Sequence, residues 1–311
     1  MKPEVRRAAE ILQRGGLVAF PTETVYGLGA DASSALAVAR LYAAKRRPSD
    51  HPVIVHFADA ETAFTWASEV PQAARKLAAK FWPGPLTLIL RKSAKAGDFI
   101  TGGQDTVGLR VPAHPVAQEL LRAFGGGIAA PSANRFGQLS PTTAGHVHAD
   151  LGSDAELVLD GGPSEVGIES TILDLSGTEP VLLRPGKISR AELEDLLNFP
   201  VLAKQADSPR HSGGLERHYA PRTPARLVPT HLLDQEIARL EAKVAVLAFS
   251  RPDERVDYWL RMPREPAAYA QKLYATLREL DGAHCEMILI EAPPEAPEWA
   301  GVRDRLMRAT T

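Results

Sequence analysis

Short apolar runs recur along the first 200 residues, and stretches with helical periodicity separate several of them. Runs of this length, rich in Val, Ile and Leu, are typical of buried strands, whereas apolar residues spaced by three and four predict amphipathic helices. This alternation predicts an α/β domain built on one sheet. The predicted strands are residues 17–20, 53–57, 86–90, 107–111, 128–130, 157–159, 171–174 and 181–183, and the predicted helices are residues 35–45, 61–70, 72–81 and 115–124.

A change of pattern near residue 200 predicts the end of this first domain. Ser189 and Glu192 stand three residues apart, as in a capping box, and predict a last helix that ends before Pro200. Residues 201–222 lack periodicity and are rich in Gly, Pro, Ser and charge, which is typical of a linker. This linker also carries an unusual group of side chains suited to binding: His211, Arg217, His218 and Tyr219.

Beyond the linker, strand and helix candidates alternate again, which predicts a small parallel α/β domain. The candidates are residues 225–228, 232–241, 243–250, 266–280, 286–292 and 300–309. We therefore expect a first domain over residues 1–200, a linker over 201–222 and a second domain over 223–311.

Composition narrows the class of protein. The 311 residues include 36 Lys and Arg against 38 Asp and Glu, and this net charge of −2 gives no bulk attraction to nucleic acid or anionic membranes. No apolar run approaches the length of about 18 to 20 residues that a membrane span needs, and the N-terminus is typical of a charged helix start, not of a signal peptide. The single cysteine, Cys285, excludes an internal disulfide and a thiolate-rich zinc site. We expect a cytoplasmic protein without membrane contact.

The segment after the first predicted strand, PTETVYGLGADA at 21–32, combines hydroxyls, a carboxylate and glycines. Open α/β sheets place their binding sites at such strand ends. Lys45 and Arg47 end the next predicted helix, where cations either complement the helix dipole or clamp phosphates. His56 closes the following strand, in a structural or a catalytic role.

Further polar side chains lie within or beside the later strands. Arg110 lies in an apolar strand, where an unpaired cation would cost several kcal/mol, so it needs either an internal carboxylate or an anionic substrate. The chain has no GxxxxGK[ST] phosphate loop. Hydroxyl, amide and guanidinium groups at several strand ends therefore predict a nucleotide or anion pocket of another type. They belong to Ser132, Asn134, Ser140, Ser170 and Arg184.

Motifs for a metal centre or a covalent nucleophile do not occur in the sequence. HExxH, CxxC and GxSxG are all absent. We therefore expect neither a protein-bound metal nor a catalytic nucleophile, and a chemistry that depends on positioning and electrostatics.

Seven ordered motifs resemble those of the Sua5/YrdC/YciO family: PTETVYGLGADA (21–32), KRRPSDHPVIVHF (45–57), FWPGPLTLIL (81–90), TVGLRVPAHP (106–115), AAPSANRFGQLSPT (129–142), DGGPSEVGIESTILD (160–174) and LLRPG (182–186). The linker motif HYAP (218–221) and the trailing domain resemble the two-domain Sua5 branch. The resemblance implies a YrdC-like twisted open sheet, then a linker or lid, then a small Rossmann-like parallel α/β domain.

The resemblance also implies an activity, that of a nucleotidyltransferase called L-threonylcarbamoyladenylate synthase. L-threonine, bicarbonate and ATP would give threonylcarbamoyl-AMP and pyrophosphate, for N6-threonylcarbamoyladenosine at position 37 of tRNAs. Mg²⁺ would be carried by the ATP phosphates, and tRNA threonylcarbamoyl-transfer proteins would use the product. Direct contact with tRNA stays open.

By matching motifs, the resemblance also implies the residues of the site. Those for threonine and its carbamate would be Thr24, His56, Arg110, Ser132 and Ser170, with Arg110 on the amino-acid carboxylate. Those for ATP would be Lys45, Arg47, His51, Thr106, Asn134, Ser140, Arg184 and Tyr219. The chain departs from the family at His51, where Asn is frequent, and at Ser212-Gly213, where Pro-Gly is common.

Two other functions stay open at this point. One is a double-stranded RNA or tRNA-binding module without synthase activity, although the cations stand singly and lack the interleaved aromatic residues that base stacking needs. The other is a related carbamoyl-adenylate-forming enzyme, which would normally bring acylphosphatase and zinc-finger segments that this chain lacks.

Overall fold

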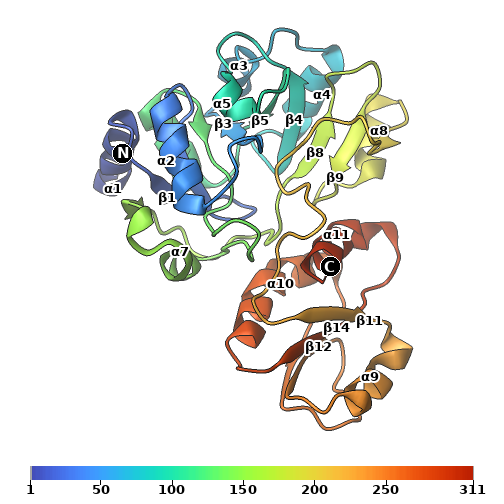
Figure 1. Cartoon of the computed structure of the whole chain (residues 1–311). Coiled ribbons are helices and arrows are strands. Elements are labelled where there is room, and N and C mark those ends of the chain that lie inside the picture. The colour runs from blue at the N-terminus through green and yellow to red at the C-terminus, as the bar shows by residue number, and fades with distance from the viewer. Residues whose placement is uncertain (1, 311) are drawn as a thin grey trace.

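A computed structural model describes residues 2–310 of the chain, which form two α/β parts (Figure 1). The larger, N-terminal part is built on a mixed sheet of ten strands in the order β10-β9-β8-β4-β5-β3-β6-β2-β1-β7. Its strands are β1 (Val18–Phe20), β2 (Gly27–Asp31), β3 (Ile54–His56), β4 (Leu86–Arg91), β5 (Thr106–Arg110), β6 (Ile128–Ala129), β7 (Leu157–Val158), β8 (Thr171–Asp174), β9 (Val181–Arg184) and β10 (Leu202–Ala203). The predicted α/β class with one open sheet is confirmed.

Strand β2 was missed by the sequence analysis, which predicted no strand between residues 20 and 53. The segment pairs with β1 on one side and with β6 on the other. A Cβ at Gly29 would lie 2.8 Å from the Ile128 side chain and 2.9 Å from the Phe20 ring. Glycine is a weak strand former, but here the neighbouring side chains leave no room for any other residue.

The helices of this part are α1 (Pro3–Gln13), α2 (Ala35–Lys45), α3 (Ala60–Phe64), α4 (Gln72–Phe81), α5 (Asp98–Thr101), α6 (Pro115–Phe124), α7 (Ala144–Leu151) and α8 (Arg190–Leu197), with a short 3₁₀ turn at Gly152–Asp154. Three of the predicted helices, at residues 35–45, 72–81 and 115–124, match helices of this part, whereas α5 and α7 were not predicted. The capping box of Ser189 and Glu192 is present at the start of α8. Helix α3 is shorter than predicted because the chain after it turns to pair with the end of β4, where Ala67 bridges to Lys92.

The two faces of the large sheet differ in what covers them. Val55, Leu88 and Leu109 belong to a large apolar cluster that includes side chains of α2, α4 and α8. Successive residues of a strand point to opposite faces, and Ile54, Ile89 and Ile172 form a separate, smaller cluster on the other face. That second face lies toward the linker and the C-terminal part (Figure 1).

The C-terminal part is a four-stranded, all-parallel sheet in the order β11-β14-β12-β13, as predicted. Strand β13 was missed, since it lies half-buried at the sheet edge and its apolar run is only three residues long, between Asp257 and Arg261. The elements are β11 (Ala225–Val228), β12 (Val244–Ala248), β13 (Tyr258–Arg261), β14 (Met287–Glu291), α9 (Leu233–Arg239), α10 (Pro266–Asp281) and α11 (Ala300–Ala309), with 3₁₀ turns at Thr230–Leu232 and Pro297–Trp299.

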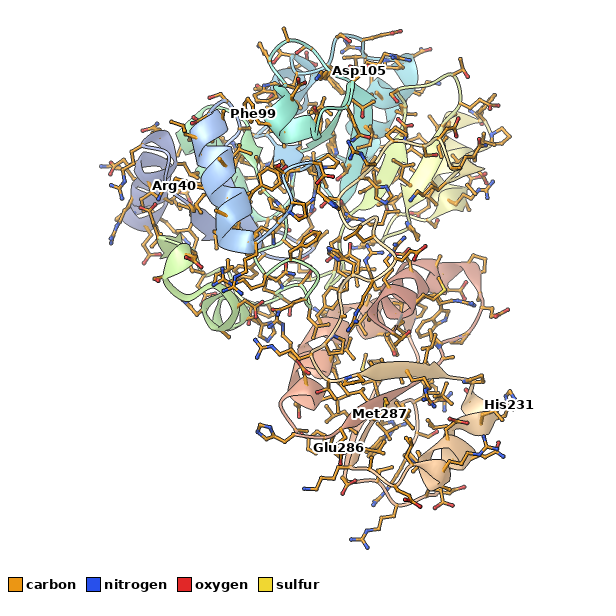
Figure 2. All side chains as sticks on the ribbon, viewed as in Figure 1. Arg40, Phe99, Asp105, His231, Glu286 and Met287 are labelled. Atoms are coloured by element: carbon orange, nitrogen blue, oxygen red, sulfur yellow. The ribbon has the colours of Figure 1, made fainter. Side chains whose placement is uncertain are left out.

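Helices α10 and α11 pack the C-terminal part against the first one (Figure 1). Val166 and Ile168 of the first part share one apolar cluster with Leu273 and Val302 of the second. Gly167 has a φ of +79°, and a Cβ there would lie 2.4 Å from the Ala270 carbonyl oxygen, so α10 rests directly on this backbone. Side chains from both parts fill the space between them (Figure 2).

The predicted linker divides into two stretches. Its first residues, through β10, pair with β9 and extend the large sheet. The remainder runs across the junction of the two parts (Figure 1). Within residues 2–310, no helix combines the length and the apolar character that crossing a bilayer requires.

Candidate active site

A pocket on the second face of the large sheet collects most of the predicted site residues. Those that line it are Thr24, Lys45, Arg47, His56, Arg110, Ser132, Asn134, Ser170, Arg184 and Tyr219. Its wall also includes Phe136, Glu169, Ser212 and His218, none of which the sequence analysis assigned to a substrate.

The strand register explains part of this convergence. His56 and Arg110 are paired residues at the ends of the parallel strands β3 and β5. Ser170 precedes β8, which lies antiparallel to β9 and brings Arg184 to the same sheet edge. Thr24 and Ser132 follow β1 and β6, which run antiparallel to β3, so these two arrive from the opposite edge. Because the sheet is mixed, the pocket collects side chains from both strand edges.

Three cations in this pocket are buried and lack a carboxylate partner within residues 2–310. Lys45, Arg47 and Arg184 are only 1%, 6% and 2% exposed. The Lys45 ammonium donates to the carbonyls of Ser132, at 2.5 Å, and Asn134. Burial lowers the pKa of Lys45 well below its usual range and also lowers the pKa of Arg47. Because burial disfavours the charged forms of these side chains, an anion bound beside them would stabilise their charges.

The two arginines also keep donor capacity that the protein does not satisfy fully. Arg47 Nη2 donates to the Pro52 carbonyl at 2.8 Å, but its buried Nε has no hydrogen-bond partner among the described residues. Arg184 donates only to neutral oxygens, which include the Ser170 carbonyl at 3.1 Å and the Ser212 carbonyl at 2.9 Å. Guanidinium groups of this kind are suited to phosphate oxygens.

Arg110 has the internal carboxylate that the sequence analysis left as one of two alternatives. Its Nη2 donates to Glu23 Oε1 at 2.6 Å, and its Nε lies 3.3 Å from the Gly84 carbonyl oxygen. Glu23 Oε2 in turn accepts from the Ala113 backbone at 3.0 Å. The Arg110 Nη1 makes no hydrogen bond to a described residue, which leaves its two N–H groups free beside the pocket.

Neutral polar groups complete the wall around Arg110. Burial and the Arg110 charge lower the pKa of His56 to about 3, so its ring is neutral near pH 7, and its buried Nδ1 has no partner among the described residues. The Ser170 hydroxyl lies 2.8 Å from Thr87 Oγ1 and accepts from Arg184 Nη2 at 3.2 Å. The Thr24 hydroxyl lies 2.8 Å from that of Thr22.

Burial of neutral histidines predicts a loss of stability in weak acid. His56, His211 and His218 each have a pKa lowered from 6.5 to about 3, so below pH 6.5 the unfolded chain binds protons that the folded chain does not. We expect the unfolding free energy to fall by about 1 kcal/mol per histidine between pH 7 and pH 5.5. Denaturant titrations at both pH values measure it. His231 is exposed, so a His231→Gln control should lose as much unfolding free energy between the two pH values as the wild type does. Equal unfolding free energies of the wild type at both pH values would contradict the prediction.

Three predicted ATP residues do not line the pocket. His51 packs edge-on against the Phe136 ring, with the ring centres 5.2 Å apart. Ser140 donates to Glu169 Oε1 at 2.5 Å. Thr106 lies in a smaller recess beside the pocket. Their contacts with ATP stay predictions.

Glu169 is the centre of a buried network that the sequence analysis missed. Its Oε2 accepts from Arg305 Nε at 2.7 Å and from the Tyr274 hydroxyl at 3.0 Å. Burial by itself would raise the pKa of Glu169, but the charges of Arg305 and Arg184 and the Ser140 hydrogen bond outweigh it and lower this pKa to about 2. The motif GIES at 167–170 was the one available signal, but the partners on α10 and α11 lie more than 100 residues away.

The end of the linker reaches the pocket as predicted. Tyr219 is buried in an αL conformation, with a φ of +60°, and its hydroxyl accepts from Arg184 Nη1 at 3.3 Å. A Cβ at Gly213 would lie 1.9 Å from that hydroxyl oxygen, so only glycine fits there. Of the four linker residues singled out earlier, only Arg217 is exposed.

Comparisons with known proteins agree with this architecture over its whole length. The family model described as "Telomere recombination", which covers Sua5, YciO and YrdC, matches residues 10–186. The model described as "Threonylcarbamoyl-AMP synthase, C-terminal domain" matches residues 188–311. Threonylcarbamoyl-AMP synthases of Pyrococcus abyssi and Bacillus subtilis are 40% and 39% identical to the chain, over 99% of it and 94% and 93% of their own lengths. A crystal structure of P. abyssi Sua5 complexed with L-threonine matches with a TM-score of 0.93 and 38% identity, over 98% of this chain and 94% of that one.

Proposed function

We propose, from the premise that the chain belongs to the two-domain threonylcarbamoyl-AMP synthase family, that the pocket described above is where this ATP-using nucleotidyltransferase makes its product for tRNA modification. The observation that carries the assignment is the set of buried cations without carboxylate partners, Lys45, Arg47 and Arg184. They would hold the phosphates of ATP. Arg110, with its free Nη1, would hold the carboxylate of L-threonine.

The reaction needs no covalent bond to the protein. The threonine amine attacks the carbon of bicarbonate, a C–N bond forms, and water leaves to give a carbamate. A carbamate oxygen then attacks the α-phosphorus of ATP, and the bond from that phosphorus to the bridging oxygen breaks as pyrophosphate leaves. Charge develops on the phosphoryl oxygens during this step, so fixed cations around them stabilise the transition state.

The remaining predicted residues would orient the two reacting molecules. Thr24, Ser132 and Ser170 offer hydroxyls, and His56 a neutral ring, on the wall around Arg110. Asn134 and Tyr219 line the side nearer the buried cations, where we place the nucleotide. His51, Thr106 and Ser140 lie beside the pocket and would complete the contacts of the nucleotide there. Fixing both molecules in one pocket replaces a bimolecular encounter by an internal step.

Mg²⁺ would come with the nucleotide and not from a protein cage. Glu169 is the one carboxylate among the described residues that line the pocket, and its oxygens already accept from Ser140, Arg305 and Tyr274. Within residues 2–310, no group of three or more His, Cys, Asp or Glu side chains could hold a metal ion. The phosphate oxygens of ATP would therefore be the ligands of Mg²⁺, and the ion would neutralise part of their negative charge.

The phosphate assignment predicts a selective loss of nucleotide affinity. Arg47→Ala should weaken ATP binding by about tenfold or more, because a charge-assisted hydrogen bond is lost, and should leave threonine binding unchanged. Isothermal titration with each substrate measures both. Arg46→Ala is the matched control, since Arg46 is the exposed neighbour of Arg47, and it should bind ATP as the wild type does. Unchanged ATP affinity in Arg47→Ala would favour a helix-capping role instead.

We also propose that the protein works in the cytoplasm and hands threonylcarbamoyl-AMP to tRNA threonylcarbamoyl-transfer proteins. The product is a reactive mixed anhydride, and closure of the linker over the pocket would protect it from water until release. Limited proteolysis of residues 204–217 with and without ATP tests whether the linker opens and closes. Equal cleavage in both states would reduce it to a tether.

A further inference from the structure

A recess beside the main pocket holds a side chain that the proposed function does not use. It is walled by Ile54, Ile89 and Ile172 of the sheet face, with Gly108 between them, and by Gln104 and Thr106 at its rim. His211 of the linker lines it on the side away from the sheet face. The recess shares Ile54 and Ser212 with the main pocket, so the two spaces are neighbours.

His211 is buried without satisfying its own polar atoms. It is 4% exposed, and neither ring nitrogen has a hydrogen-bond partner among the described residues. Burial, together with the charges of Arg184, Lys204 and Arg308, lowers its pKa to about 3, so the ring is neutral near pH 7. A neutral imidazole still carries one donor and one acceptor, and leaving both unmade is costly. The ring therefore occupies a space that does not match it chemically.

Arg210, the residue before His211, fixes this part of the linker through contacts at the protein surface. The Arg210 backbone donates to Gln104 Oε1 at 2.7 Å, and Gln104 Nε2 donates back to the Arg210 carbonyl at 3.1 Å. The Arg210 guanidinium donates to the Gly102 carbonyl at 2.7 Å and lies 3.7 Å from Asp50. These contacts are solvent-exposed, and exposed contacts of this kind are individually weak. We call these contacts of Arg210 with Gln104, Gly102 and Asp50 the Arg210–Gln104 latch, and we expect them to break and re-form readily.

The shape and chemistry of the recess fit one part of one substrate. Bicarbonate and the threonine backbone are small and polar, whereas the adenine ring of ATP is flat and largely apolar. Three isoleucines and a glycine on a sheet face offer a flat apolar floor, and Thr106 offers a polar atom at its rim. The cations proposed to hold the phosphates lie in the adjoining pocket.

We propose that His211 is an autoinhibitory plug, which narrows the recess for the adenine ring and must be displaced when the nucleotide binds, while the contacts of Arg210 with Gln104 set how often it leaves. The inference rests on the proposed function, because the recess is assigned to adenine by its position beside the phosphate site. Only molecules whose recess is open can then bind the base. The apparent affinity for any adenine nucleotide is therefore reduced in proportion to the fraction of open molecules.

Calorimetric titration with adenosine and with pyrophosphate separates this effect from the phosphate site. His211→Ala should bind adenosine about tenfold more tightly than the wild type, a change of about 1.4 kcal/mol, and pyrophosphate equally well. Gln104→Ala opens the exposed latch without touching the apolar core and should also tighten adenosine binding. His231→Ala, at the far side of the C-terminal part (Figure 2), should change neither affinity.

Two results would overturn the plug. Unchanged adenosine affinity in both His211→Ala and Gln104→Ala would show that nothing is displaced, and weaker affinity in His211→Ala would show that His211 recognises the base. Failure of the proposed function has a different signature, because it would appear as wild-type protein that does not bind pyrophosphate. As a second measurement, adenosine should raise the modification of His211 by diethylpyrocarbonate, and protection by adenosine would contradict displacement.

Discussion

A chain carrying Arg110→Gln together with Glu23→Gln should fold and yet lose threonine-dependent pyrophosphate release by at least about a hundredfold. The paired change removes both charges of the buried ion pair, whose atoms lie 2.6 Å apart, and so leaves no unpaired carboxylate behind. What disappears is the cation that we assign to the threonine carboxylate. Pyrophosphate release at saturating ATP, followed against threonine concentration, measures the effect.

The single variants show why the pair is needed. Arg110→Ala alone leaves Glu23 buried and charged, which should cost about 3 to 5 kcal/mol of folding free energy and confuse loss of function with loss of fold. Glu23→Gln alone keeps the guanidinium and should keep threonine-dependent activity. Near-normal apparent affinity for threonine in the double variant would remove Arg110 from the substrate site.

Arg305→Met should destabilise the whole chain by about 3 to 5 kcal/mol, because it leaves the Glu169 carboxylate buried without its principal cation. Arg305 has no exposed side-chain surface, and its Nε lies 2.7 Å from Glu169 Oε2. The change also removes the donor that joins α11 to the pocket wall, so synthesis should fall with stability. Denaturant titration and pyrophosphate release on the same samples measure both.

Two comparison variants test the cause of that loss. Arg305→Met combined with Glu169→Gln removes both charges and should recover much of the folding free energy. Arg303→Met, on the same helix, breaks only a surface ion pair with the exposed Glu295 and should cost less than about 1 kcal/mol. If Arg305→Met were as stable as Arg303→Met, the buried network would not hold the two parts of the chain together.

The sequence predicted the elements whose stability depends on local periodicity. Helices α2, α4 and α6 match the predicted ranges, since each buries one apolar stripe against the sheet. Strand β2 was missed because its glycines are selected by the side chains of β1 and β6, which only the tertiary structure brings together. Local pattern carries no information about such a neighbour.

The sequence predicted part of the candidate site. Strand ends and family motifs pointed to Lys45, Arg47, His56, Arg110 and Arg184, which do line one pocket. The partners that decide their charge state could not be read from the sequence, because they come from distant segments. Glu23 lies 87 residues from Arg110, and Arg305 lies 136 residues from Glu169.

The linker shows the limit of composition as a guide. Gly, Pro and charge predicted an irregular linker, and residues 204–207 and 215–217 are exposed. His211, His218 and Tyr219 are buried nonetheless, since the sheet face and helix α11 supply a surface against which this irregular segment packs. The composition of a segment indicates whether it favours a helix, a strand or an irregular conformation. It does not show which surface of the folded protein covers the segment.

A crystal structure of the protein with L-threonine and a non-hydrolysable ATP analogue tests the central assignment most directly. The account predicts phosphate oxygens within hydrogen-bond distance of Lys45, Arg47 and Arg184, and the threonine carboxylate on the Nη1 of Arg110. Phosphates bound away from these three cations, or a threonine carboxylate held by any group other than Arg110, would contradict it.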